Sequence, residues 1–169
     1  MNDAHLHMVV NHFPIIGTIF GLGILITGLV LKNNIIKNTA FVLFAVSAAF
    51  SFASMYTGEG AEEMVENLPG VGHKIIHEHE ELAEKFAIVM YVLGILSLIG
   101  LFLNIKNHAK AKFVSLAVLV VAIAASVLVN GVGTSGGEIR HTEIRESGAQ
   151  LDSDKNASGE DASEYNEED

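Results

Sequence analysis

The chain has 169 residues, of which 50% are hydrophobic, and it carries a formal net charge of −10. This composition is more apolar than that of an ordinary soluble domain, and the acidic balance excludes a nucleic-acid-binding protein that works through a basic face. The chain contains no cysteine, which excludes disulfides, thiolate-bound zinc, iron–sulfur clusters and covalently attached c-type haem. Any metal site must therefore use His, Met or oxygen ligands.

Four long runs without Asp, Glu, Lys or Arg lie at about residues 13–31, 39–56, 86–105 and 113–129. Each is close to the roughly 17 to 25 residues that a helix needs to cross the hydrocarbon layer of a membrane. Because unpaired backbone groups are costly in lipid, these runs must be helical. We expect an all-α, integral membrane four-helix bundle formed by residues 1–145.

Most of the acidity lies in the C-terminal segment 146–169, which holds nine acidic residues and one Lys. This segment is rich in Ser, Asp and Glu and has few large apolar side chains, so burial cannot offset the entropy lost on ordering. We expect a disordered acidic tail. Such a tail could attract a basic periplasmic electron carrier, with a rate that falls as salt increases, or it could simply be solvated.

The two short links between the apolar runs carry Lys and no acidic residue: Lys32 and Lys37 in the first link, and Lys106, Lys110 and Lys112 in the second. No Lys or Arg precedes the first run, and that run is longer than the apolar part of a signal peptide. By the positive-inside rule, the links face the cytoplasm and both termini lie outside it. This pattern predicts a multi-pass membrane protein with both termini on the outer side.

Histidine is distributed unevenly in this topology. Seven of the eight histidines fall at the predicted outer end, and only His108 falls at the inner end; the seven are His5, His7, His12, His73, His77, His79 and His141. Imidazoles from separate helices that converge at one end of a bundle are typical of metal and cofactor sites.

Helical spacing separates these histidines. If a helix begins near Gly72, His79 shares the apolar face of Leu82 and Phe86 and points into the bundle. His77 lies on the opposite, charged face with His73 and several Glu side chains. His12 directly precedes Phe13 and Pro14, where the first apolar helix begins, with proline suited to a first helical turn.

Two imidazoles on facing helices, without thiols, suit a six-coordinate haem b. We expect His12 and His79 as axial ligands, with His7 and His141 as substitutes or as members of a second site. The Gly-rich segment after the fourth run permits a sharp turn, so that Arg140 or Arg145 could fold back and pair with haem propionates. Small residues such as Gly17 and Gly21 would make room for haem, although their spacing is also typical of helix packing.

The opening Leu6-His7-Met8-Val9-Val10-Asn11-His12-Phe13-Pro14-Ile15 resembles the "LHP…VHFPIAL" signature of an uncharacterised family of small four-helix bacterial inner-membrane domains. The region around His79 and the segment Gly136–His141 resemble later motifs of that family. Met8 stands where the family has proline. Family members occur fused to cytochrome c or Rieske-type modules, so the resemblance implies an electron-transfer setting and a haem-binding bundle, with His7, His12, His79 and His141 at the family's histidine positions.

Two further functions remain open. His73, His77 and nearby Glu side chains could bind a divalent metal at the outer surface. Alternatively, the bundle could be a cofactor-free subunit that packs within a larger respiratory membrane complex through its small-residue faces. No Gly-x-Ser-x-Gly or His-Glu-x-x-His motif is present, so the sequence identifies no catalytic residue. Membrane lipid is the one expected partner common to all three hypotheses.

Overall fold

The computed structural model describes residues 2–68 and 70–145, and within these ranges the chain is helical and contains no strand. The helices are α1 (Asp3–Val10), α2 (His12–Val30), α3 (Asn34–Val65), α4 (His73–Ile105) and α5 (Ala111–Arg140), followed by a short 3-10 turn at Thr142–Ile144. The predicted all-α four-helix bundle is confirmed, with α1 and α2 forming one bent element. The predicted tail, 146–169, lies outside the described residues.

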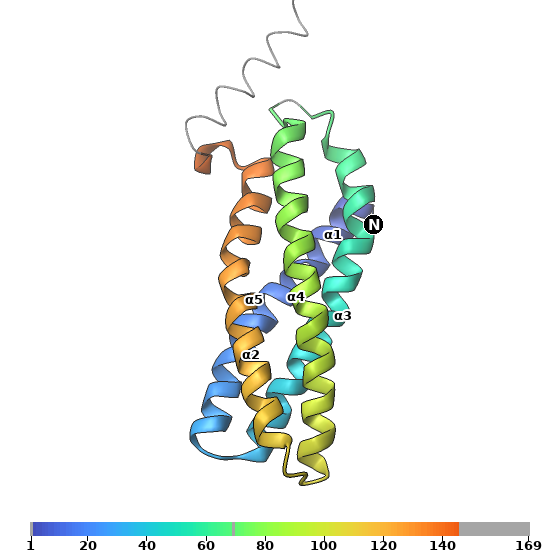
Figure 1. Ribbon diagram of the computed structural model, residues 1–169. Coiled ribbons are helices and arrows are strands. Elements are labelled where there is room, and N and C mark those ends of the chain that lie inside the picture. The colour runs from blue at the N-terminus through green and yellow to red at the C-terminus, as the bar shows by residue number, and fades with distance from the viewer. Residues whose placement is uncertain (1, 69, 146–169) are drawn as a thin grey trace, which may run out of the picture.

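The long helices run antiparallel in chain order, and α5 returns to pack against α2 (Figure 1). Helix α1 lies across α3. The chain start, the α3–α4 loop and the end of α5 meet at one end of the bundle, which also holds the seven grouped histidines; we call it the histidine-rich end. The two short links lie at the opposite end with His108.

The outside of the bundle carries many exposed apolar side chains, including Ile16, Phe20, Val30, Phe52, Ile88, Ile95, Phe102, Phe113, Val120 and Val127. Soluble monomers rarely expose an apolar surface of this extent, whereas helices in contact with lipid do. Four helices are long and apolar enough to cross a membrane. With 33 residues, α4 spans about 50 Å, more than the ~30 Å hydrocarbon layer. Its charged first turns, before Phe86, therefore extend beyond that layer.

Helix α1 is separated from α2 by one residue, Asn11. The cause is local, because Pro14 has no N–H to donate to the carbonyl of Val10 and its ring crowds that turn. Asn11 keeps helical backbone angles, so the result is a bend. The bend turns α1 onto α3, where Asp3 lies against Gly60.

The core is built by close helix contact as well as by large side chains. Phe41, Phe44, Leu25, Met90 and Val118 are completely buried. Glycines let the neighbouring helices approach; they include Gly21 against Phe44, Gly100 against Phe41 and Gly94 against Ala48. The small residues within the apolar runs thus serve helix packing.

The Gly-rich segment 130–137, expected to turn, is helical instead, because α5 continues without a break to Arg140. Its glycines serve close approach to α4: a Cβ at Gly131 would touch Leu82, and one at Gly136 would crowd His79. Tertiary packing has therefore overridden the low helix propensity of glycine. The chain bends only after Arg140.

Arg145 is buried at the histidine-rich end of the bundle. Its side chain is 6% exposed, and its guanidinium donates hydrogen bonds to the carbonyls of Glu138 (2.7 Å), Ile139 (3.0 Å) and Gly70 (2.8 Å). Two of these carbonyls belong to the last turn of α5, whose C=O groups lack helical partners. Arg145 thus caps α5 and ties it to the α3–α4 loop.

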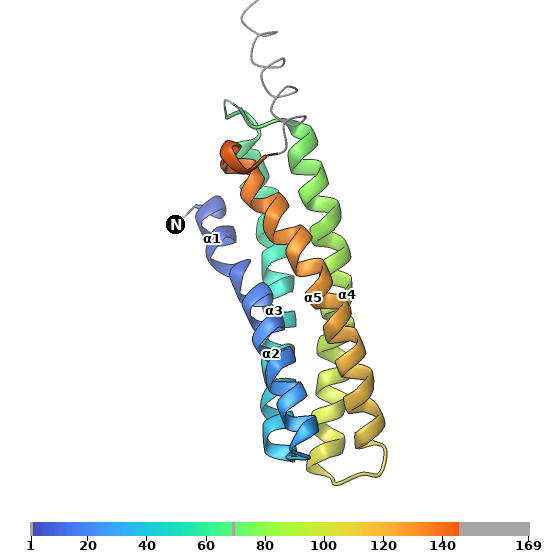
Figure 2. The same ribbon diagram turned by 90° about the vertical axis from the view of Figure 1, so that its left-hand side faces the viewer.

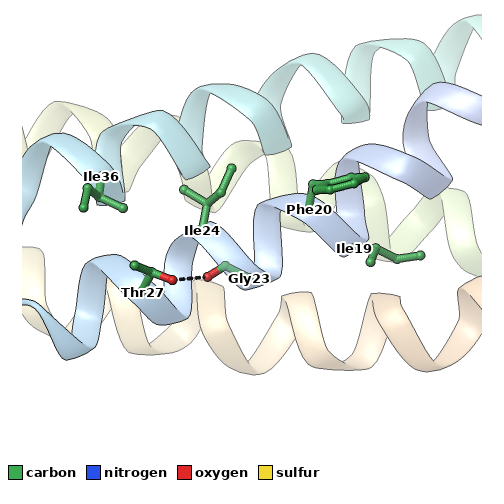
Figure 3. A pocket seen from close by; sticks show the side chains of 6 residues that line it. All are labelled: Ile19, Phe20, Gly23, Ile24, Thr27 and Ile36. Carbon is green, nitrogen blue, oxygen red and sulfur yellow. Dashed lines mark hydrogen bonds between the residues drawn. The ribbon is translucent and has the colours of Figure 1, made fainter.

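A shallow groove of about 270 Å³ runs along the lipid-facing side of α2, lined by Ile19, Phe20, Gly23, Ile24, Thr27 and Ile36 (Figure 3). The Thr27 hydroxyl donates back to the Gly23 carbonyl at 2.9 Å, so the groove presents little free polarity. It lies on the apolar span, away from the histidines.

The glycine contacts predict a contrast between two alanine variants. Gly94→Ala places a Cβ 2.5 Å from the Ala48 Cβ, which cannot rotate away. We expect it to lower the free energy of unfolding by about 1–3 kcal/mol through overpacking. The control is Gly23→Ala, since a Cβ there meets nothing within 4 Å. Its helix propensity predicts unchanged or slightly higher stability. Unfolding titrations in mixed micelles measure both, and equal losses would contradict the packing argument.

Candidate functional site at the histidine-rich end

The structure separates the predicted site residues into two groups. His7 and His79 are half-buried and point into the bundle. The others, apart from Arg145, are exposed: His12, His73, His77, Arg140 and His141. The predicted ligand pair is therefore divided, because His79 is half-buried whereas His12 is exposed.

His7 projects from α1 onto α3. Its Nδ1 lies 3.0 Å from the Ser54 carbonyl oxygen and 3.2 Å from the Thr57 hydroxyl. A carbonyl can only accept, so Nδ1 carries the proton and donates it. The ring lies beside Gly58, where a Cβ would be 3.7 Å from the His7 Cε1, an ordinary van der Waals contact.

His79 projects from α4 onto α5 in a similar way. Its Nδ1 lies 2.9 Å from the hydroxyl of Ser135, a residue that is 8% exposed. Gly136 follows, and a Cβ there would be only 3.0 Å from the His79 Cε1. As the helical spacing predicts, His79 shares its inward face with Leu82 and with the buried Phe86.

The two imidazoles interact. Both lie beyond the apolar runs 13–31 and 86–105, at the end of the bundle. Burial lowers the pKa of His79 below its ordinary value of 6.5, and the nearby charge of a protonated His7 lowers it further. Burial also lowers the pKa of His7, partly offset by the bond to the Ser54 carbonyl. Both side chains are therefore neutral at pH 7.

Each inward imidazole uses Nδ1 and leaves Nε2 without a hydrogen bond to any described residue. One turn after His7, Asn11 points in the same direction, and its Oδ1 is buried without a partner in the described part of the chain. In the view of Figure 2, α1 leans away from α5 at this level, whereas α2 below packs against α5. The histidine-rich end thus presents unused polar atoms toward its interior.

His12 and His141 are turned away from this interior. The His12 Nδ1 lies 2.7 Å from the carbonyl of Met8 in the preceding turn. The His141 Nδ1 lies 2.9 Å from a carboxylate oxygen of Glu143, and both side chains are exposed. Each of these contacts is local and engages only Nδ1 of the exposed ring.

The alternative divalent-metal site is not assembled. His77 lies 3.4 Å from a Glu81 carboxylate oxygen and 3.9 Å from one of Glu80, as expected for neighbours one turn apart on a solvated face. His73 is exposed at the start of α4. Over residues 2–68 and 70–145, no group of three or more metal-binding side chains converges.

The sequence analysis missed Ser54, Thr57 and Ser135 as partners of the imidazoles. A signal does exist. Thr57-Gly58 on α3 and Ser135-Gly136 on α5 are both hydroxyl–glycine pairs, and their hydroxyls contact His7 of α1 and His79 of α4, respectively. The bundle thus consists of two helical hairpins that hold their imidazoles in the same manner. One hairpin is formed by α1 and α2 with α3, and the other by α4 with α5.

The lowered pKa values of His7 and His79 predict acid destabilisation. Between those values and the ordinary 6.5, the unfolded chain binds more protons than the folded one, so the stability present above pH ~6.5 is lost as the pH falls. We expect the melting temperature in detergent to decrease as the pH is lowered from about 7.5 to about 5. The double variant His7→Gln/His79→Gln should show a smaller fall, and an identical fall would contradict the assignment.

Comparison with family models, curated proteins and solved structures finds no match for this chain. The resemblance of residues 6–15 to a family of small four-helix membrane domains therefore stays a prediction. The function is inferred from the side chains that meet at the histidine-rich end.

Proposed function

We propose that the protein is a membrane-bound haem b protein that takes part in electron transfer, and that His7 and His79 are the residues that would hold the haem iron. The observation that carries the proposal is the pair of inward, neutral imidazoles that come from different helices and keep Nε2 unused. Nε2 is a nitrogen through which neutral histidine binds metals. This pairing replaces the His12–His79 pair expected from spacing alone.

The residues present fit such a group. In metal-binding histidines the second ring nitrogen is normally held by a carbonyl, a carboxylate or water, as Ser54 holds His7. Gly136 leaves space for the His79 ring, since a Cβ there would be 3.0 Å from its Cε1. Leu82 and Phe86 supply apolar surface below His79. The absence of cysteine is consistent with haem held by coordination and packing alone.

When bound, haem supplies one-electron chemistry. The chain itself provides two ligand nitrogens and an apolar flank. Burial of His7 and His79 lowers the pKa of both imidazoles and so disfavours their protonation. Of the two arginines expected to pair with propionates, Arg145 directs Nε, Nη1 and Nη2 to backbone carbonyls. Arg140 is exposed and lies four residues after Gly136, on the same face of α5. It is therefore the better candidate to pair with a haem propionate.

The proposal places the histidine-rich end outside the cytoplasm of a bacterial inner membrane. Its support is the lysine content of the two links at the opposite end: Lys32, Lys37, Lys106, Lys110 and Lys112. This orientation puts the imidazole pair near the outer membrane surface, where an external electron carrier could reach it.

A basic electron carrier is the partner that this surface suits. Residues 57–85, which form the outer parts of α3 and α4 and the loop between them, contain eight Glu and only two Lys. Burial raises the pKa of Glu80, and so does the neighbouring Glu62 carboxylate, which accepts a hydrogen bond from the protonated form of Glu80 and repels its charged form. Complementary charge accelerates encounter.

Four histidine variants test haem binding. We expect purified wild-type protein to show reduced-minus-oxidised bands of haem b, and His7→Ala and His79→Ala to lose them. His12→Ala and His108→Ala should keep them, because these rings lie outside the interior pair. Pyridine-haemochrome assays quantify the haem, and gel filtration confirms that each variant is folded.

Two outcomes would contradict the assignment. Loss of haem in His12→Ala together with its retention in His7→Ala would restore the His12–His79 pair. A colourless wild-type protein from haem-replete cells would favour the cofactor-free subunit of a larger respiratory complex.

Partner binding is tested by its salt dependence. We expect the rate of electron transfer to a small basic cytochrome to fall steeply as ionic strength rises, since exposed charges are screened beyond about 10 Å at 0.1 M salt. Neutralising Glu59, Glu63 and Glu66 with Gln should flatten this dependence. A rate that is independent of salt would exclude electrostatic docking at this surface.

A further inference from the structure

We infer that Ser135 is a positioning residue that holds His79 in the Nδ1–H tautomer and leaves its Nε2 lone pair available as a ligand. The tautomer is inferred from the hydrogen-bond partners of Ser135 and His79 and from the cost of an unpaired donor. Its role in ligation rests on the proposed function.

The hydroxyl of Ser135 has one proton to donate. Its Oγ lies 3.3 Å from the Val132 carbonyl oxygen on the same helix and 2.9 Å from the His79 Nδ1. If the proton goes to the carbonyl, the hydroxyl must accept from Nδ1, so Nδ1 carries the ring proton. Every donor in the chain from His79 to Ser135 to Val132 is then paired.

The opposite tautomer leaves a donor without a partner. With the proton on Nε2, Ser135 would donate to Nδ1, and the Nε2–H would have no acceptor among the described residues. An unpaired donor in a half-buried position is more costly than an unused acceptor lone pair. The Nδ1–H form is therefore favoured.

The first hairpin supports this assignment independently. Thr57, the counterpart of Ser135, donates its proton to the Ala53 carbonyl at 3.0 Å and lies 3.2 Å from the His7 Nδ1. There the tautomer is fixed by Ser54, whose carbonyl oxygen can only accept. Both hairpins then present the same ring nitrogen, Nε2, to the interior.

Nitrogen-15 NMR of the full-length, haem-free protein tests the tautomer directly. With histidine labelled on both ring nitrogens, and at a pH above the ordinary histidine pKa of about 6.5, we expect Nδ1–H signals for His7 and His79. Ser135→Ala removes the acceptor and should move His79 toward the Nε2–H form without changing His7. Ser135→Thr restores a hydroxyl and should restore the signal.

A matched control is Ser126→Ala on the same helix. The Ser126 hydroxyl bonds only its own helix, at the Ala122 carbonyl, so its loss should leave His79 unchanged. A wild-type His79 in the Nε2–H form, or a His79 signal that Ser135→Ala leaves unchanged, would overturn the inference.

Haem titration provides the second readout. Loss of a group that orients a metal ligand typically weakens affinity by roughly 10–100-fold, and we expect this of Ser135→Ala but not of Ser126→Ala. If the NMR result holds and wild-type protein binds no haem, the proposed function fails and the positioning role stands. If haem binds and the tautomer is unaffected by Ser135→Ala, the positioning role fails and the proposed function stands.

Discussion

Satisfaction of backbone hydrogen bonds within lipid is the constraint on which this structure depends. Because no water is available to pair N–H and C=O groups in the hydrocarbon layer, each apolar run must close its bonds internally as a helix. The helices then have no hydrophobic reason to associate, and close contact must hold them together. Gly94 against Ala48 and Gly21 against Phe44 provide that contact. Polar chemistry is left to the helix ends, where the histidines gather.

The same constraint explains the form of the imidazole pair. A half-buried histidine is stable only when its donor finds an acceptor, and here each ring directs Nδ1 to the neighbouring helix of its own hairpin. Each imidazole is therefore positioned by residues of its own hairpin. The proposed ligand nitrogens are the atoms that this arrangement leaves unused.

Glycine has two roles that composition does not distinguish. In the apolar spans it brings helices together, whereas at Gly136 it makes room for the imidazole ring of His79. The Gly-rich end of α5 suggested a turn because glycine is a poor helix former in isolation. Packing against α4 keeps it helical, and Arg145 then ends the helix by capping its carbonyls.

The sequence by itself determined the helical class, the four apolar spans, the grouping of seven histidines at one end and the inward direction of His79, because all of these depend on local composition and on the period of a helix. Only the tertiary structure decided that His7 is half-buried against α3 whereas His12 is exposed. The bend that Pro14 imposes at Asn11 turns α1 onto α3, which directs His7 inward, while the His12 ring is held on its own backbone at Met8. Spacing along a chain does not specify the direction in which α1 bends. That direction depends on contacts with another helix, where the Ser54 carbonyl and the Thr57 hydroxyl meet His7.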